Sequence, residues 1–275
     1  MANLHESAVG MMRDILAKTG PGKEEEAMAS ALRVAAKWRS QLLAHTVIGL
    51  HGTTILHGPF AGMQYVDRSA EGALAARLIG SYESELHPHL AAFASQGIHH
   101  VVDIGCAEGY YAVGLARLWP NVNVYAFDTD PEALKLCAAL ARSNGVAERV
   151  HLGGEFHGDD FEKFVGRRTL FIVDIEGGER YLLDPELYPA LKELQFIVET
   201  HPGASPGITD TLIGRFAPTH DIQVVMQGPK TTPLPEWLHG LGHLDSLLSV
   251  WEWRSTPTPW LVMRPRAAPQ VDSTP

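Results

Sequence analysis

From about Ser69 onward, short apolar runs alternate with segments of helical pattern. The candidate strands are HHVVDIG, VNVYAFD, RVHLGG, TLFIVDIE, QFIVET, DIQVVMQ and WLVMRP. Several of these runs are continuously apolar, which is typical of strands covered on both faces by helices. A helix between most consecutive strands favours parallel pairing through crossover connections. We therefore predict a doubly wound α/β fold with a mainly parallel sheet.

The chain before this pattern is different in character. Apolar residues recur at helical spacing from Glu24 to His45, and a shorter helix is predicted from Glu6 to Lys18. The breaker Thr-Gly-Pro-Gly at 19–22 separates the two helices. Residues 47–66 are rich in glycine and β-formers, which indicates short strands or a hairpin.

These patterns divide the chain into three parts. We expect a helical and hairpin extension over residues 1–68, a main domain over 69–265 and a flexible tail over 266–275. Too few residues precede the sheet to build a separate core. The extension is therefore expected to act as a lid or as the contact of a homodimer.

The composition excludes several classes of partner. The formal net charge is -10 and no dense run of Lys or Arg occurs, so nucleic acid is not expected to be a partner. No stretch is long and uncharged enough for a membrane span, and the N-terminus lacks the apolar segment of an export signal. Cys106 and Cys137 are too few for a disulfide framework, and we interpret them as small apolar fillers. A cytoplasmic protein with a small-molecule substrate is expected.

The most informative motif is the strand, turn and helix over residues 101–111. Ligands of open α/β sheets bind outside the carboxyl ends of the strands, where this turn is predicted to lie. Gly105 and Gly109 remove side chains where a ligand approaches the backbone, and the helix near Gly109 directs free N–H groups toward a carboxylate. We assign Asp103, Gly105, Cys106 and Gly109 to cofactor binding.

The spacing of these glycines indicates which cofactor is bound. Gly-x-x-x-Gly differs from the Gly-x-Gly-x-x-Gly fingerprint that cradles a pyrophosphate, which argues against NAD. Asp128 ends the next predicted strand, where an acid accepts hydrogen bonds from the two ribose hydroxyls. Thr129 beside it is assigned to the same site.

Two pairs of motifs carry a family resemblance. DIGCAEGYYAVGLA and VYAFDTDP resemble the first two motifs of class I S-adenosylmethionine (SAM)-dependent methyltransferases, while VDIEGGE and FIVETH are similar to the DxEGxE and ExH elements of FkbM-type methyltransferases. The resemblance covers about residues 70–265. It implies a Rossmann-like sheet of seven strands with a reversed last strand, SAM over the carboxyl edge, and methyl transfer, often to a hydroxyl.

The resemblance suggests two further cofactor contacts. Phe156 follows the third predicted strand where related proteins contact adenine, so its ring either stacks on the adenine or belongs to the core. Glu83 follows Tyr82 on the helix before the first strand, which packs beside the first turn in this fold. Glu83 is therefore expected to reach the cofactor.

Acidic residues and a histidine end the fourth and fifth predicted strands. Asp174, Glu199 and His201 would suit either a divalent metal ion or general base catalysis. Acids at the ends of these same two strands hold magnesium in catechol-type O-methyltransferases. In the alternative, Asp174 contacts the SAM amine and Glu199 caps a loop. We name Asp174, His201 and His57 as catalytic candidates, with His243 as a further candidate base.

The sequence thus predicts an O-methyltransferase with SAM as cofactor, a small-molecule acceptor and a possible divalent metal. Two other readings stay open. The pocket could use SAM for aminopropyl transfer or for cyclisation of the cofactor, or it could bind SAM without catalysis. Glu176 and Glu179 are interpreted as either site residues or acids that solvate a helix start.

Overall fold

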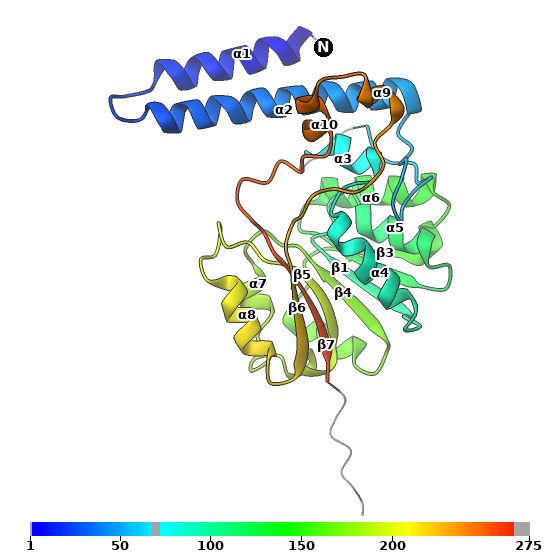
Figure 1. The fold of residues 1–275 in the computed structure, drawn as a ribbon. Coiled ribbons are helices and arrows are strands. Elements are labelled where there is room, and N and C mark those ends of the chain that lie inside the picture. Colours follow the sequence, from blue (N-terminus) through cyan, green and yellow to red (C-terminus); the bar gives the residue numbers. More distant parts are fainter. Residues whose placement is uncertain (1, 68–71, 267–275) are drawn as a thin grey trace, which may run out of the picture. The chain divides into compact units, whose positions relative to one another are not determined.

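The computed structural model describes residues 2–67 and 72–266 and divides into two compact units (Figure 1). The first unit comprises Met1–Ser84 and Lys230–Trp253, and the second comprises Glu85–Pro229 and Arg254–Pro275. The first unit therefore contains the expected extension together with two segments that were assigned to the main domain. Apart from Arg266, the tail expected at 266–275 lies outside the described residues.

The second unit is built on a seven-stranded sheet in the order β3-β2-β1-β4-β5-β7-β6. Its strands are β1 His100–Ile104, β2 Asn123–Phe127, β3 Val150–Gly153, β4 Thr169–Val173, β5 Gln195–Glu199, β6 His220–Val225 and β7 Trp260–Pro265. Strand β7 runs antiparallel to both β5 and β6, while β1 to β5 pair in parallel. This topology confirms the predicted sheet and its reversed last strand.

Helices and short turns connect the strands of this unit. They are α4 His87–Ala94, α5 Tyr110–Leu118, α6 Pro131–Ser143, α7 Glu179–Leu182, α8 Ile208–Phe216, and the 3-10 turns η2 Ala147–Arg149, η3 Gly158–Phe164 and η4 Pro189–Glu193. All five residues of β4 are buried. Burial on both faces explains why this strand is continuously apolar in sequence.

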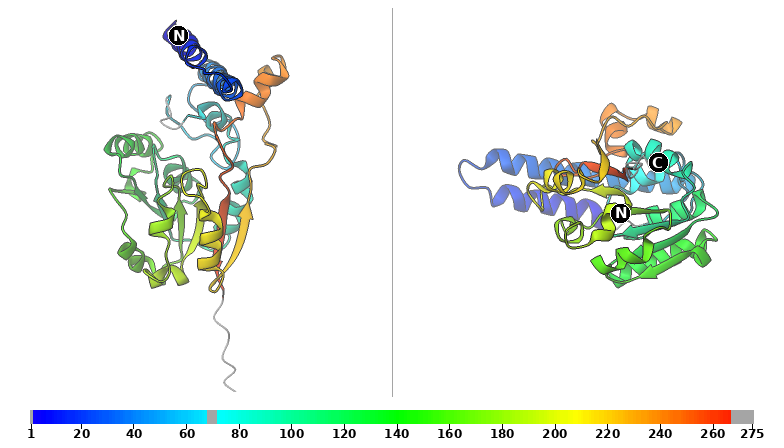
Figure 2. Two further views of the ribbon diagram at one scale, coloured as in Figure 1. Left: turned by 90° about the vertical axis from the view of Figure 1, so that its left-hand side faces the viewer. Right: turned by 90° about the horizontal axis from the view of Figure 1, so that it is seen from below.

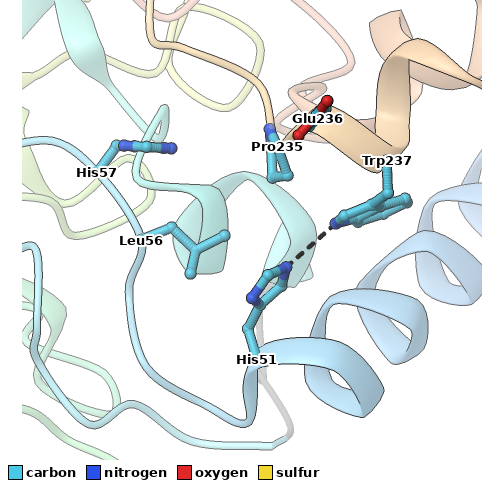
Figure 3. Close-up of a pocket in the computed structure, with 6 residues that line it drawn as sticks. All are labelled: His51, Leu56, His57, Pro235, Glu236 and Trp237. Atoms are coloured by element: carbon cyan, nitrogen blue, oxygen red, sulfur yellow. Dashed lines mark hydrogen bonds between the residues drawn. The ribbon is translucent and has the colours of Figure 1, made fainter.

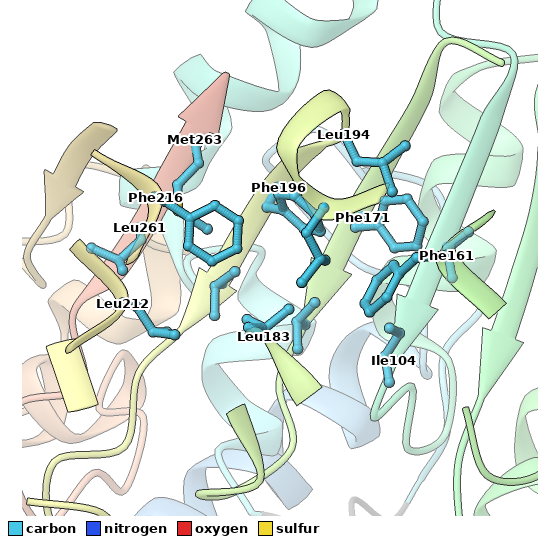
Figure 4. Packing of buried hydrophobic residues seen from close by; sticks show 14 of the residues in the cluster. Ile104, Phe161, Phe171, Leu183, Leu194, Phe196, Leu212, Phe216, Leu261 and Met263 are labelled. Atoms are coloured by element: carbon cyan, nitrogen blue, oxygen red, sulfur yellow. The ribbon is translucent and has the colours of Figure 1, made fainter. Parts of the chain in front are cut away.

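Aromatic side chains fill the core on one face of the sheet (Figure 4). Phe171 and Phe196 project from β4 and β5, with ring centroids 5.3 Å apart. Phe161 from η3 and Phe216 from α8 pack against them, with edge-on or tilted ring geometry typical of aromatic pairs. This core fixes the strands whose ends carry the site.

The register of the parallel strands aligns their carboxyl ends. Ile104 at the end of β1 pairs with Phe127 of β2 and with Val173 of β4. Val173 in turn pairs with Val198 of β5. The residues that follow β1, β2, β4 and β5 consequently begin at one level, at the carboxyl edge of the sheet.

The first unit is largely helical. It contains α1 Ala2–Ala17, α2 Glu24–His51, α3 Leu74–Ile79, α9 Glu236–His239 and α10 His243–Ser249; the 3-10 turn η1 Ser84–Leu86 crosses into the second unit. Helices α1 and α2 lie side by side as an antiparallel pair (Figures 1 and 2). Among the described residues, no helix combines the length and apolar character that a membrane span requires.

One expectation for this region is wrong, the end of the long helix. Helix α2 continues to His51 through residues predicted as β-structure, because Val47 is completely buried when the helix continues. Gly52 then ends it with φ 67°, and its N–H donates to the carbonyl of Ile48 at 2.8 Å. The expected hairpin is present in short form: Thr54 and Gln64 form an antiparallel bridge, the N–H of Tyr65 donates to the carbonyl of Thr53 at 2.8 Å, and the N–H of Ile55 donates to the carbonyl of Met63 at 2.9 Å.

The helix expected before β1 is also interrupted. Gly80 ends α3 with φ 86°, and its N–H donates to the carbonyl of Ala76. A Cβ at Gly80 would lie 2.0 Å from the carbonyl oxygen of His57, so the chain approaches this glycine too closely for a side chain. The remaining residues form η1 and α4.

Candidate active site

The turn after β1 depends on glycine at both of its ends. Gly105 has φ 84°, and a Cβ there would lie 1.7 Å from the carbonyl oxygen of Asp174. Gly109 has φ 96°, and a Cβ there would lie 2.7 Å from Sγ of Cys137. The sequence predicts that these clearances serve a ligand. In the structure, protein atoms use them, so that the exits of β1 and β4 pack directly together.

Asp128 at the end of β2 stabilises this turn by hydrogen bonds. Its Oδ2 accepts a hydrogen bond from the N–H of Ala107 at 2.9 Å, and its Oδ1 accepts one from the N–H of Asp130 at 2.8 Å. A carboxylate offers about four acceptor positions. Each oxygen therefore keeps acceptor capacity that suits the ribose hydroxyls of SAM. Thr129 beside it is exposed.

The remaining residues of the turn are mostly buried. Asp103 and Glu108 are 3% and 1% exposed. Cys106 and Cys137 are both buried free thiols, and a hydrogen bond between the Cys106 thiol and Cys137, together with burial, raises the pKa of Cys106. A thiol that stays protonated is a poor nucleophile, which supports the interpretation of both cysteines as packing residues.

Phe156 is a member of the aromatic core. Its side chain is 7% exposed and its ring lies edge-on to Phe127 and Phe161, with centroids 5.0 and 4.9 Å away. This packing favours the core interpretation over adenine stacking.

Glu83 and His57 belong to the first unit, so their approach to the cofactor stays a prediction. Glu83 is 1% exposed with φ 48°, and its N–H donates to Oε1 of Glu252 at 2.7 Å. His243 is exposed at the start of α10.

His57 lines an open pocket of about 630 Å³ in the first unit (Figure 3). The other lining residues are His51, Leu56, Pro235, Glu236 and Trp237. Nε1–H of Trp237 donates to Nε2 of His51 at 3.2 Å. That hydrogen bond requires Nε2 of His51 to be unprotonated.

The side chain of His201 lies among carboxylates at the carboxyl edge of the sheet and is almost fully buried. Its Nδ1 lies 2.7 Å from Oε1 of Glu179. Its Nε2 lies 3.4 Å from Oδ1 of Asp174, 3.6 Å from Oε2 of Glu176 and 3.9 Å from Oε2 of Glu199. The acids after β4 and the histidine after β5 are thus brought together, as the sequence predicted.

Glu199, expected as a metal ligand, forms an ion pair with Arg254. Its Oε1 accepts a hydrogen bond from Nη1 of Arg254, which also donates to Oγ1 of Thr258. This ion pair balances the charge of Glu199, so it is a weaker metal ligand than the sequence suggested. Among the described residues, one ligand atom each of Asp174, Glu176 and His201 lies within 4.8 Å of the others.

A left-handed turn places Glu176 in this group. Glu176 has φ 51° and Gly177 has φ 108°, which reverses the chain directly after β4. The side chain of Glu176 remains 75% exposed. Periodicity could not reveal this reversal, because it depends on the conformation of two single residues.

Glu179, which the sequence left open as a site residue or a helix-start acid, contacts His201. Its side chain is completely buried, and Oε1 also accepts the N–H of Gly177 at 3.2 Å. Its Oε2 is buried without a hydrogen-bond partner among the described residues. The signal was present in the motifs, because Glu179 is the last acid of DxEGxE and His201 is the histidine of ExH. The structure shows that these two motif residues touch.

The surroundings of His201 shift its protonation. Burial of the ring opposes the charged form, but the hydrogen bond to Glu179 and the carboxylate of Asp174 outweigh it, so the pKa of His201 is raised. The imidazole consequently keeps its second proton to a higher pH than an ordinary histidine.

Residues 97–166 match the family model of a methyltransferase domain. The ribosomal protein L11 methyltransferase of Pelotomaculum thermopropionicum is 36% identical over 91 residues, which is 33% of this chain and 28% of that protein. The ribosomal protein uL3 glutamine methyltransferase of Neisseria meningitidis is 29% identical over 99 residues, or 33% of this chain and 32% of that protein. The chain thus spans less than a third of the length of these relatives.

Solved methyltransferase structures are also similar. The O-methyltransferase TomG from Streptomyces achromogenes, in complex with SAM, has a TM-score of 0.45 at 12% identity and covers 66% of this chain and 81% of that one. An O-methyltransferase from Bacillus cereus has a TM-score of 0.43 at 11% identity, covering 64% and 78%.

The residues that match the methyltransferase-domain model run from just before β1 to just after η3, so they contain the glycine turn after β1 and Asp128 at the end of β2.

Proposed function

We propose that this chain transfers the methyl group of SAM to a hydroxyl of a small molecule, with His201 as the general base. The observation that carries the proposal is the geometry of His201. Glu179 holds Nδ1 at 2.7 Å, so the opposite nitrogen, Nε2, is directed toward Asp174 at the end of β4. That nitrogen lies at the sheet edge where ligands of open α/β sheets bind.

The residues that would hold the cofactor surround the turn after β1. Asp128 has acceptor capacity for the ribose hydroxyls, and the backbone after Gly105 lies beside it. Asp174 is placed to accept a hydrogen bond from an amino group at the β4 exit. SAM, when bound, supplies an electrophilic methyl group on a positively charged sulfur.

His201 has the geometry to accept the proton that an acceptor hydroxyl loses. In the neutral tautomer set by Glu179, Nδ1 carries the hydrogen and donates it to Oε1, while the lone pair of Nε2 is available. Nε2 takes the hydroxyl proton, and the ring becomes an imidazolium. The carboxylates of Glu179 and Asp174 stabilise that positive charge, which is the role an acid plays behind a catalytic histidine.

A metal-assisted reaction is the second candidate, favoured by the mutual closeness of the donors on Asp174, Glu176 and His201. Two carboxylates and an imidazole suit Mn²⁺, Fe²⁺ or Zn²⁺ better than Mg²⁺, which prefers oxygen ligands. A divalent ion held there would supply Lewis-acid chemistry toward the acceptor hydroxyl.

The acceptor class rests on two supports. The resemblance to FkbM-type proteins favours a hydroxyl, and the acidic chain lacks the basic runs that nucleic acid requires. The relatives named as ribosomal protein methyltransferases make a protein acceptor the competing class.

Labelled SAM separates these proposals. The enzyme is incubated with a metabolite extract and, separately, with ribosomal proteins. Labelled small molecules together with S-adenosylhomocysteine are expected. Labelled protein alone would reject the small-molecule acceptor, methylthioadenosine would indicate aminopropyl transfer or another non-methyl reaction, and SAM binding without turnover would indicate a binding protein.

Variants of two residues then separate base from metal. His201→Ala should lower kcat by roughly 10²–10⁴ while SAM affinity, measured by calorimetry, stays near that of the wild type. Full activity in excess EDTA would reject the metal. Activity that EDTA abolishes and Mn²⁺ or Zn²⁺ restores, together with an Asp174→Asn variant that loses metal binding, would reject the purely protein-based mechanism.

A further inference from the structure

The hairpin of α1 and α2 has almost no core of its own. Among the described side chains of α1, Ala8 is the one that is buried, and in α2 the first buried side chain is Ala27 and the next is Ser40. Two helices that bury so little against each other are marginal in water, because helical stability comes mainly from packing an apolar face. The hairpin therefore needs a further apolar surface.

An exposed apolar face is present on the hairpin. Val9 and Leu16 of α1 are 41% and 51% exposed, and Met28 and Leu32 of α2 are 63% and 71% exposed. Leu16 and Met28 line the same open pocket of about 460 Å³ at the closed end of the hairpin. Met28 and Leu32 are four residues apart, so they lie one above the other on one side of α2. We call these four residues the hairpin face.

The sequence of α2 is complementary to itself around Ser30. When two copies of α2 pair antiparallel about a two-fold axis at Ser30, Met28 of each copy lies opposite Leu32 of the other. Glu25 then lies opposite position 35, and Arg33 opposite position 27. Glu25 of one copy and Arg33 of the other are therefore displaced from each other along the helix axis by two residues, or about 3 Å at 1.5 Å per residue.

Because this displacement is small, opposite charges lie close to each other across the contact, as the apolar residues do. Glu25 and Arg33 are both exposed. On a helical projection both are rotated from Leu32 in the same direction around α2, Glu25 by about 20° and Arg33 by about 100°. A two-fold axis preserves that side, so Glu25 of each copy meets Arg33 of the other, once at each end of the contact. One surface patch that is complementary to itself is the requirement of a closed, isologous dimer.

We infer that the hairpin face is a homodimer interface in which α2 pairs antiparallel with α2 of a second copy about Ser30. The two hairpins together form four helices, which supply the apolar layer that one hairpin lacks. Leu16 extends the buried surface toward the closed end of each hairpin, and Val9 of the antiparallel α1 lies about level with Leu32 of α2.

Sedimentation and light scattering of the full chain test the inference. The chain has a mass of 30.0 kDa, so the dimer is expected at about twice that mass. Leu32→Glu should give the monomer at concentrations at which the wild type is a dimer. Leu187→Glu is the matched control, because Leu187 is 67% exposed in the second unit and lies outside the hairpin face. It should leave the dimer intact.

Charge reversal tests the register without disturbing the fold. Glu25→Arg and Arg33→Glu should each raise the dissociation constant, by about tenfold, and the double variant should restore it. Restoration is expected because the reversed pairs again match across the two-fold axis.

Three outcomes would overturn the inference. The first is a wild type that is monomeric at every soluble concentration, including one that instead binds vesicles of phosphatidylcholine and phosphatidylglycerol, which would assign the face to a lipid surface. The second is a Leu32→Glu variant with helical circular dichroism that remains a dimer. The third is a charge-reversed double variant that stays as weak as the single ones.

Discussion

Replacement of Gly105 by alanine tests the contact between the exits of β1 and β4. The added Cβ would lie 1.7 Å from the carbonyl oxygen of Asp174, with the backbone held at φ 84°. The neighbour is backbone rather than the end of a flexible side chain, so rotation of a side chain cannot relieve the overlap. One of the two strand exits must move.

The loss in the free energy of unfolding caused by Gly105→Ala has two components. A left-handed conformation at a residue other than glycine costs about 1–2 kcal/mol. Overpacking of a buried contact costs about 1–3 kcal/mol. Together they give roughly 2–5 kcal/mol, which is a large part of the 5–15 kcal/mol stability of a typical domain but leaves it folded. The melting temperature should fall by roughly 4–20 °C for a domain of this size.

Calorimetry and urea denaturation measure the loss of stability. Gly154→Ala is the matched control, because Gly154 is exposed, has no left-handed φ, and a Cβ there would meet nothing within 4 Å. It should change the free energy of unfolding by less than about 0.5 kcal/mol. A Gly105→Ala variant that melts together with the control would refute the packing argument. The same displacement should also weaken binding of S-adenosylhomocysteine, because it moves the backbone of Asp174.

Three further predictions concern single side chains. Asp128→Ala should weaken SAM binding by about 1–3 kcal/mol, because the ribose hydroxyls lose a charged acceptor; an unchanged affinity in calorimetry would remove Asp128 from the site. The raised pKa of His201 places the loss of its base form above pH 6.5, so kcat should fall as the pH drops through that raised value. Glu179→Gln removes a carboxylate from His201 and should move this acid limb to lower pH, and a pH–rate profile with a stationary limb would contradict the assignment. Burial lowers the pKa of His220, so the stability it contributes is present above pH 6.5 and is lost as the pH falls through the lowered value; His220→Asn should flatten the dependence of the urea midpoint on pH in that window, and an unaltered slope would argue against this linkage.

The sheet could be predicted because its signals are local and repeated. Each strand is a short apolar run, and β4 is buried along its whole length, as a continuous apolar sequence requires. The first unit was harder to predict. Residues 47–51 have β-forming composition, yet they continue α2 because Val47 is buried in that conformation. Burial of this kind depends on partners distant in sequence, which composition does not disclose.

The candidate site shows the same division between local and distant information. Strand ends predicted that Asp174 and His201 would meet, since parallel strands bring their carboxyl ends to one edge. The partner of Glu199 is Arg254, which follows in the chain only after β6 and a long connection. No spacing rule links two residues so far apart, so the sequence overestimated Glu199 as a ligand and underestimated Glu176.

The two candidate mechanisms compete for one atom, Nε2 of His201. Nδ1 is engaged by Glu179 at 2.7 Å, so a proton from the acceptor and a divalent ion would both have to use the lone pair of Nε2. A metal ligand must be the neutral imidazole, and the carboxylates that raise the pKa of His201 also favour the competing proton. Those same carboxylates attract a cation, so Asp174 and Glu176 support either occupant. If a metal binds Nε2, His201 is no longer available as the base, and the acceptor proton must leave through another group.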